Sequence, residues 1–206
     1  MSILYVGTKS ASRRMLLDQA KIPYVLVSQD ADESVCDVAP DLQSMVTAIA
    51  LQKMNHVVLP TGKEGDVCFV LTADTLSQDA QGVIAGKPKD TQEAVAMIKA
   101  ARGGVFTGTA FCLARKRWVH DKWYCEEYII EYVKSECVFN VPDEWIESYL
   151  HNSPALNASG AITIEDYGMQ FLTSVNGSYS AIIGLPMVEL RKALEKLNFF
   201  SHVNTL

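Results

Sequence analysis

The predicted fold of this chain is built around the stretch Val67-Cys68-Phe69-Val70-Leu71-Thr72-Ala73-Asp74-Thr75. Its first seven residues form an apolar run that is typical of a strand buried on both faces. We expect that strand to end at Asp74-Thr75. Because ligands of open α/β sheets gather at the carboxyl ends of strands, Asp74 is a candidate functional residue. A lone Asp at a strand end is also a common turn former, so the stretch by itself leaves both interpretations open.

Strand-like and helix-like segments alternate on both sides of this stretch. We expect strands at 3–7, 22–28, 107–115 and 125–138, the last two as a hairpin, and a weak strand after the loop at 157–168. We expect helices at 11–20, 41–54, 90–101 and 142–151, and a final helix that starts at Leu185-Pro186. This order predicts an α/β fold with an elongated mixed sheet flanked by helices. We expect a single domain over residues 1–206, with two lobes around a central cleft.

Composition excludes several classes of function. The formal net charge of −6 gives the protein no general attraction to nucleic-acid backbones or anionic membranes. Its five cysteines are scattered and form no CxxC pair, which favours reduced thiols over a disulfide framework or a zinc site. No leader sequence is visible, and no apolar run approaches the roughly 20 residues that span a bilayer. We therefore expect a cytoplasmic protein that binds neither nucleic acid nor membrane.

The start of the first helix is a candidate phosphate site. A helix start offers unpaired N–H groups and the positive end of the helix dipole. Ser10 and Arg13 lie three positions apart, so one helical turn can present both side chains to the same anion. The alternative is an ordinary N-cap followed by solvated basic residues.

Two lysines and a second acid are further candidates. The inward stripe Leu42–Val46–Ile49 continues at helical spacing to Lys53, which either extends its ammonium to solvent or points it at something negative. Lys87 stands between Gly86 and Pro88, in a pattern that also fits a surface turn. Glu33 follows the second strand, and together with Asp74 it offers the hard oxygen ligands that Mg²⁺ prefers.

The order of these elements resembles the Maf family over roughly residues 3–197. The pattern is Ser10-x-x-Arg13, then Asp32-Glu33, Ala50-x-x-Lys53, Ala73-Asp74-Thr75, Gly86-Lys87-Pro88, Thr107-Gly108 and Gly184-Leu185-Pro186. The resemblance implies an elongated α/β fold related to the inosine-triphosphate pyrophosphatases. It also implies hydrolysis of nucleoside triphosphates between the α- and β-phosphates with Mg²⁺ or another divalent cation such as Mn²⁺. A homodimer is implied as well.

The resemblance assigns roles residue by residue. Asp74 matches the general base, and Glu33 matches an acidic residue at the catalytic and metal centre, so Glu33 and Asp74 are the expected metal ligands. The groups that match the triphosphate contacts are Ser10, Arg13, Lys53 and Lys87. Phosphoryl transfer needs positioning and neutralisation of charge more than covalent work by the protein, which agrees with such a set.

Departures from the family pattern concern the base. Ser12 replaces the first arginine of the usual Ser-Pro-Arg-Arg turn, and Glu165 falls where the dTTP/UTP-acting members carry a glutamine. This looks more similar to the branch that acts on 7-methyl-GTP. An ionised carboxylate only accepts hydrogen bonds, and guanine offers adjacent N1–H and N2–H donors. We therefore expect Ser12, Thr75 and Glu165 to line the base pocket and to favour a guanine-type base. The alternatives are a dTTP/UTP/CTP pyrophosphatase, or a nucleotide-binding regulator of septum formation.

Overall fold

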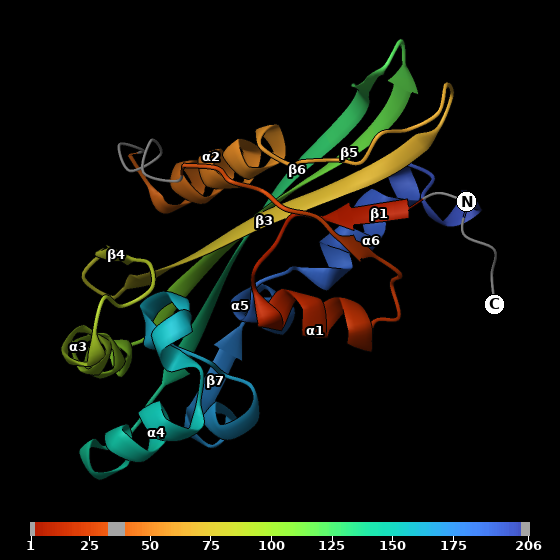
Figure 1. Cartoon of the computed structure of the whole chain (residues 1–206). Helices are drawn as coiled ribbons and strands as arrows, with labels where there is room; N and C mark the ends of the chain where they lie inside the picture. The colour runs from red at the N-terminus through yellow and green to blue at the C-terminus, as the bar shows by residue number, and fades with distance from the viewer. Residues whose placement is uncertain (1–2, 33–39, 203–206) are drawn as a thin grey trace.

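The computed structural model describes residues 3–32 and 40–202 (Figure 1). Their strands form a seven-stranded sheet in the order β2-β1-β3-β5-β6-β7, with β4 paired to β3. β1 is parallel to β2 and β3, whereas the other pairs are antiparallel. The predicted mixed sheet is therefore confirmed. The strands are β1 (Ile3–Val6), β2 (Val25–Leu26), β3 (Val67–Asp79), β4 (Ile84–Ala85), β5 (Val105–Val119), β6 (Lys122–Phe139) and β7 (Leu172–Asn176).

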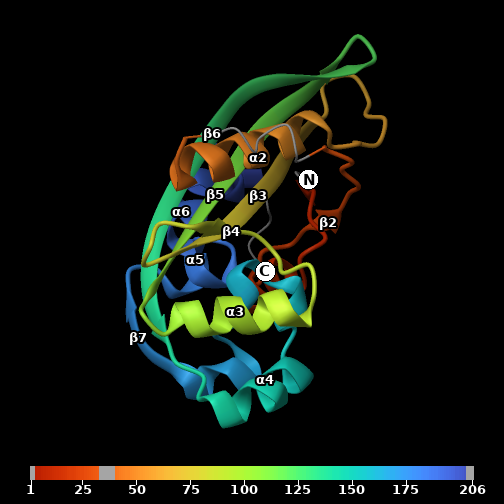
Figure 2. The same cartoon turned by 90° about the vertical axis from the view of Figure 1, so that its left-hand side faces the viewer.

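Helices flank the sheet. They are α1 (Ala11–Gln19), α2 (Leu42–Asn55), α3 (Thr91–Ala101), α4 (Ile146–Asn152), α5 (Tyr179–Ile183) and α6 (Met187–Lys196). Short 3₁₀ segments are η2 (Asp143–Trp145), η3 (Ala155–Asn157), η4 (Ser159–Ala161), η5 (Asp166–Phe171) and η6 (Phe200–His202). Figures 1 and 2 both place α3 and α4 with β7 at one end of the long strands. Across the described ranges, no helix has the length and apolar character needed to cross a bilayer.

The alternation of side chains along β3 separates the two faces of the sheet. Phe69, Leu71 and Ala73 pack in one apolar cluster with residues of α1 and α6. Cys68 and Val70 pack in another with Met54 of α2. Because successive side chains of a strand point to opposite faces, the next two residues of β3 also diverge. Asp74 faces α2, and Thr75 faces the side of α1 and α5.

The prediction that this strand ends at Asp74-Thr75 is wrong. β3 continues to Asp79, because β5 pairs with it along its entire length, from Val67 opposite Arg117 to Asp79 opposite Val105. The strand that does end here is β1, whose Val6 lies opposite Leu71. Asp74 thus stands on a continuous strand, just beyond the carboxyl end of its parallel neighbour. The predicted strand at 22–28 is also much shorter, because only Val25–Leu26 pairs with β1.

Gly108 on β5 allows α2 to lie close to the sheet. A Cβ atom at this position would come within 2.8 Å of the Leu42 side chain and within 3.0 Å of the Tyr132 ring. Leu42 opens α2 and is only 4% exposed, so its side chain has little room to move away. The close approach therefore depends on glycine, and it fixes the height of α2 above β3.

We predict that Gly108→Ala destabilises the fold by about 1–3 kcal/mol, because the added methyl group overpacks this contact. Denaturant unfolding measures the change. Gly103→Ala is the matched control, since a Cβ at Gly103 meets its nearest atoms only at 3.8 Å. Equal stability of the two variants would contradict the role given to Gly108.

Candidate active site

A cavity of about 820 Å³ opens beyond the carboxyl end of β1. This volume lies within the range of about 300–1,000 Å³ that is usual for small-ligand pockets. Its walls come from the start of α1, from α2 and β3, from Gly86-Lys87 and from the segment 154–165. Every described residue that the sequence singled out for the site lines this cavity: Ser10, Ser12, Arg13, Lys53, Asp74, Thr75, Lys87 and Glu165. Glu33 lies outside the described residues.

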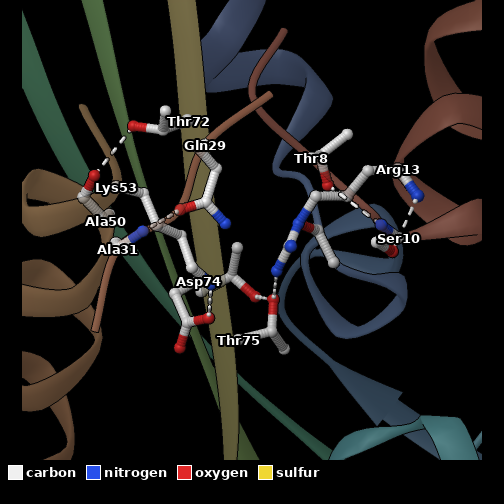
Figure 3. Close-up of polar contacts among 12 residues, drawn as sticks. Thr8, Ser10, Arg13, Gln29, Ala31, Ala50, Lys53, Thr72, Asp74 and Thr75 are labelled. Carbon is white, nitrogen blue, oxygen red and sulfur yellow. Dashed lines mark hydrogen bonds and ion pairs between the residues drawn. The ribbon is translucent and has the colours of Figure 1, made fainter. Parts of the chain in front are cut away.

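A buried ion pair stands in the wall of this cavity. The Nζ atom of Lys53 lies 2.7 Å from Oδ1 of Asp74, and each residue is only 7% exposed (Figure 3). The other carboxylate oxygen, Oδ2 of Asp74, is buried and has no hydrogen-bond partner in the part of the chain that the structure describes. Burying a carboxylate costs free energy unless both of its oxygens are paired. An unpaired oxygen in the wall of a cavity therefore indicates that Asp74 has a role in binding or catalysis.

The local sequence explains why Lys53 reaches Asp74. The Asp41 side chain caps α2, and Leu42, Val46 and Ala50 pack on the sheet beneath the helix. The Thr72 hydroxyl donates to the Ala50 carbonyl oxygen at 2.8 Å, which ties α2 to β3 two residues before Asp74. Lys53 follows Ala50 by about one helical turn, so it lies above the next inward position of β3. Of the two alternatives for Lys53, the structure shows the inward one.

The start of α1 supplies a second wall. Ser10 is the N-cap residue, and its Oγ accepts a hydrogen bond from the Arg13 backbone N–H at 3.3 Å. The Arg13 guanidinium turns toward the sheet, where Nε donates to the Gly184 carbonyl oxygen at 2.7 Å and Nη2 donates to the Thr75 hydroxyl at 2.9 Å. Figure 3 shows Arg13 and Thr75 facing each other across this wall. Arg13 thus joins the cavity wall through the protein's own groups.

Lys87 is exposed and lines the cavity, and its loop is hydrogen-bonded to the segment that carries Glu165. The Gly160 N–H donates to the Gly86 carbonyl oxygen at 2.9 Å, and Ser159 Oγ donates to the Ala85 carbonyl oxygen at 2.8 Å. The segment that carries Glu165 and the loop that carries Lys87 are therefore coupled directly.

Ser12 and Glu165 meet inside the cavity although 153 positions separate them in the sequence. Ser12 Oγ donates to Oε1 of Glu165 at 3.0 Å. Burial raises the pKa of the Glu165 carboxyl, and the nearby charge of Asp166 adds to this increase, while hydrogen bonds from the backbone and from Ser12 act in the opposite direction. Because the pKa is raised, the ionised form of Glu165 is less favourable in the folded protein than in the unfolded chain.

The fit of a divalent cation can be judged from one described ligand. Asp74 offers a buried carboxylate oxygen with no partner among the described residues, which suits a hard cation. The same residues contain no cluster of three or more His, Cys, Asp or Glu side chains that could hold a metal. Mg²⁺ commonly takes only one or two carboxylates from the protein and fills its coordination shell with phosphate oxygens and water. A site whose described carboxylate ligand is Asp74 therefore fits this ion.

Sequence reasoning missed two buried hydroxyls that shape these walls. Thr109 of β5 contacts Thr75, with 2.9 Å between the two Oγ atoms. The Tyr149 hydroxyl accepts from the Thr163 N–H at 2.9 Å and donates to the Ala161 carbonyl oxygen at 3.0 Å, which holds the segment before Glu165. Thr109 lies opposite Thr75 in the register between β3 and β5, which the predicted β5–β6 hairpin does not set, so no sequence signal marks it. Tyr149 sits in a short helix with no pattern that marks it.

We predict that Glu165→Gln raises the melting temperature more at pH 8 than at pH 4.5. A carboxyl whose pKa is raised by folding costs no stability below its ordinary value of 4.5. The cost grows as the pH rises toward the folded-state pKa, and above that pKa it is constant. Thermal unfolding of both proteins across this pH range measures the difference. Glu127→Gln, at an exposed position of β6, is the control, and an equal pH trend in both variants would contradict the burial of Glu165.

The chain matches the Maf family model, described as Maf-like protein, over residues 3–197. It is 31% identical to a dTTP/UTP pyrophosphatase of Acholeplasma laidlawii, over 99% of this chain and 100% of the relative. It is 29% identical to a dTTP/UTP pyrophosphatase of Ruminiclostridium cellulolyticum, over 96% of this chain and 97% of the relative. A nucleoside triphosphate pyrophosphatase of Prochlorococcus marinus is 27% identical, over 94% and 97%.

These names bear on two predictions from the sequence. The dTTP/UTP names run contrary to the predicted closer relation to the branch that acts on 7-methyl-GTP. The family itself was predicted correctly, and its match covers almost the whole chain. The mixed sheet and its flanking helices agree with that prediction. The chain belongs to the Maf family.

Proposed function

We propose that this protein hydrolyses a nucleoside triphosphate between the α- and β-phosphates, giving a nucleoside monophosphate and pyrophosphate, with Asp74 as the general base. The observation that carries the proposal is the Lys53–Asp74 pair in the wall of the cavity, with one carboxylate oxygen of Asp74 left without a partner among the described residues. A binding protein has no need for a buried carboxylate that is held on one side and unpaired on the other.

The wider class of activity follows from the family. Relatives that align over nearly the whole chain are named pyrophosphatases of nucleoside triphosphates. The prediction of an enzyme, a hydrolase acting on acid anhydrides, is confirmed at that level. We propose the base, the metal and the role of each residue from the geometry of the cavity.

The cavity supplies a proton acceptor, hydrogen-bond donors and positive charge, which are the groups that the attack of water on a phosphate requires. The Lys53 ammonium holds Oδ1 of Asp74, so that Oδ2 is the oxygen that takes a proton from the attacking water. The N–H groups at the start of α1, beside Ser10, offer donors and a positive dipole end to phosphate oxygens. Arg13 and Lys87 add positive charge on two sides of the cavity. Such neutralisation favours the transition state of phosphoryl transfer.

Asp74 is also the described residue that would hold a divalent cation, Mg²⁺ or Mn²⁺, with Glu33 as the second proposed ligand. The two carboxylate oxygens have about four acceptor sites between them, so contact with Lys53 and with a cation would still leave one for the proton of the attacking water. When bound, the cation supplies further neutralisation of the phosphate charge. The cytoplasmic location and the homodimer expected from the sequence remain predictions.

We propose that Glu165 reads the base and favours a guanine-type base such as 7-methylguanine. Ser12 donates to one oxygen of Glu165, and the carboxylate keeps acceptor capacity for adjacent N–H donors. The positive charge of 7-methylguanine would further stabilise the ionised carboxylate. The second candidate is dTTP or UTP, and the observation that favours it is the naming of the relatives.

Asp74→Asn tests the proposed general base. We expect turnover to fall by at least about 100-fold, because an amide does not accept the proton from the attacking water. Pyrophosphate release in the presence of Mg²⁺ measures the rate. Asp79→Asn lies at the end of the same strand, away from the cavity, and should keep normal turnover. Near-normal rates for Asp74→Asn would show that Asp74 is not the general base. Tight nucleotide binding by the native protein without pyrophosphate release would instead favour a regulator of septum formation.

A substrate panel tests the base. We expect the native protein to prefer 7-methyl-GTP and GTP over dTTP, UTP and CTP. We expect Glu165→Gln to shift the ratio of kcat/KM values toward the pyrimidines by about 10-fold or more, since the amide presents a donor as well as an acceptor. Strong hydrolysis of dTTP and UTP by the native protein, with none of 7-methyl-GTP, would establish the second candidate instead.

A further inference from the structure

Two threonines face each other across the central strands of the sheet. Thr75 of β3 and Thr109 of β5 are direct partners in the antiparallel register, and their Oγ atoms lie 2.9 Å apart. Thr109 is fully buried, and its Oγ also lies 2.7 Å from the carbonyl oxygen of Ala181 in α5. Thr109 does not line the cavity, so it has no access to a substrate there.

The hydrogen-bonding capacity of these groups fixes the direction of every bond between them. A carbonyl oxygen only accepts, so the single hydroxyl proton of Thr109 is donated to Ala181. Thr109 can then only accept from Thr75, which makes Thr75 the donor of the 2.9 Å contact. Thr75 has thereby used its own proton, and its oxygen accepts from Nη2 of Arg13 at 2.9 Å. Each link orders the next, from α5 to Arg13.

The other end of this relay also returns to α5. Nε of Arg13 donates to the carbonyl oxygen of Gly184, the residue that caps α5 at its C-terminus. The last carbonyls of a helix lack partners within the helix and carry its negative dipole end, so a guanidinium is well placed there. Arg13 is therefore anchored to α5 twice, once directly and once through Thr75 and Thr109.

We propose that Thr109 is a positioning residue, which orients the Arg13 guanidinium in the cavity wall through the hydroxyl of Thr75. The proposal rests on the proposed function where it says what Arg13 does for turnover. The hydrogen-bond relay itself does not depend on that function.

The relay also changes what Thr75 can do for a ligand. Its hydroxyl proton is committed to Thr109, so Thr75 offers a nucleotide base only an acceptor oxygen, which already receives a hydrogen bond from Arg13. Thr75 therefore serves chiefly to hold Arg13, and the reading of the base falls to Ser12 and Glu165.

The kinetic test compares Thr109→Val, Thr109→Ser and Ser135→Ala, each alone and in an Arg13→Ala background. Thr109→Val keeps the shape and removes the hydroxyl, whereas Thr109→Ser keeps the hydroxyl. Ser135 is the matched control, because its buried hydroxyl holds the other end of α5 by accepting from the Ser178 N–H at 2.9 Å.

With Arg13 present, we expect Thr109→Val to lower kcat/KM for the best substrate by about 10- to 100-fold, the effect of a misplaced binding group. Thr109→Ser and Ser135→Ala should stay close to the native value. In the Arg13→Ala background, Thr109→Val should have no further effect, because the group that it positions is gone. An equal loss in both backgrounds, or an equal loss in Ser135→Ala, would overturn the proposal and assign Thr109 to folding alone.

Proton exchange gives a readout that needs no turnover. In the native protein, NMR should detect slowly exchanging hydroxyl protons of both Thr75 and Thr109, and protected Nη2 protons of Arg13. In Thr109→Val the Thr75 hydroxyl loses its acceptor, so the slow exchange of that proton and the protection of the Arg13 Nη2 protons should be lost, while the Nε–H, which Gly184 holds directly, stays protected. Thr109→Ser should keep both the slow exchange and the Nη2 protection. Fast exchange of the native Thr75 hydroxyl would overturn the relay even without any variant. Absence of pyrophosphate release by the native protein would overturn the proposed function and leave this exchange result to decide the relay.

Discussion

The contact between the Lys53 ammonium and the Asp74 carboxylate is the interaction on which the site depends. Removing two charges from water is costly, and attraction between them offsets this cost only when the geometry is good. Here the distance is 2.7 Å, and α2 must lie close to the sheet to reach it. Gly108 permits that approach, and the Thr72–Ala50 hydrogen bond fixes the height of the helix. The packing of α2 on one face of the sheet thus brings Lys53 within contact distance of Asp74.

The sheet topology makes the space that this pair faces. β1 ends while β3 continues against β5, so the strand that carries Asp74 and Thr75 extends beyond its parallel neighbour. Strand alternation then sends Asp74 toward α2 and Thr75 toward α1 and α5. The same two adjacent residues therefore organise two walls, one through an ion pair and the other through a chain of hydroxyls. The segment that carries Glu165 closes the cavity and is tied to the loop of Lys87.

Much of this arrangement was predictable because it depends on local patterns. The cap of α1 and the β5–β6 hairpin follow from spacing and from residue type, and the stripe Leu42–Val46–Ile49 brought Lys53 to the sheet side of α2 while leaving the direction of its ammonium open. The end of β3 was not predictable, because pairing along the whole of β5 overrides the polar residues that follow Ala73. The relay through Thr109 requires knowledge of the register between two strands, and no local pattern supplies it. The base preference does not follow from the fold, because the Glu165 carboxylate favours a guanine-type base whereas the names of the relatives favour dTTP and UTP.

The most direct test of the central claim is a crystal structure of the protein with Mg²⁺ and a triphosphate analogue whose α–β bridge resists hydrolysis. We predict that the polyphosphate lies in the cavity beyond β1, between the start of α1 and Lys87. Asp74 should then lie beside the α-phosphate, and the base should contact Glu165. A triphosphate bound elsewhere, with Asp74 and Lys53 unchanged and remote from it, would contradict the account.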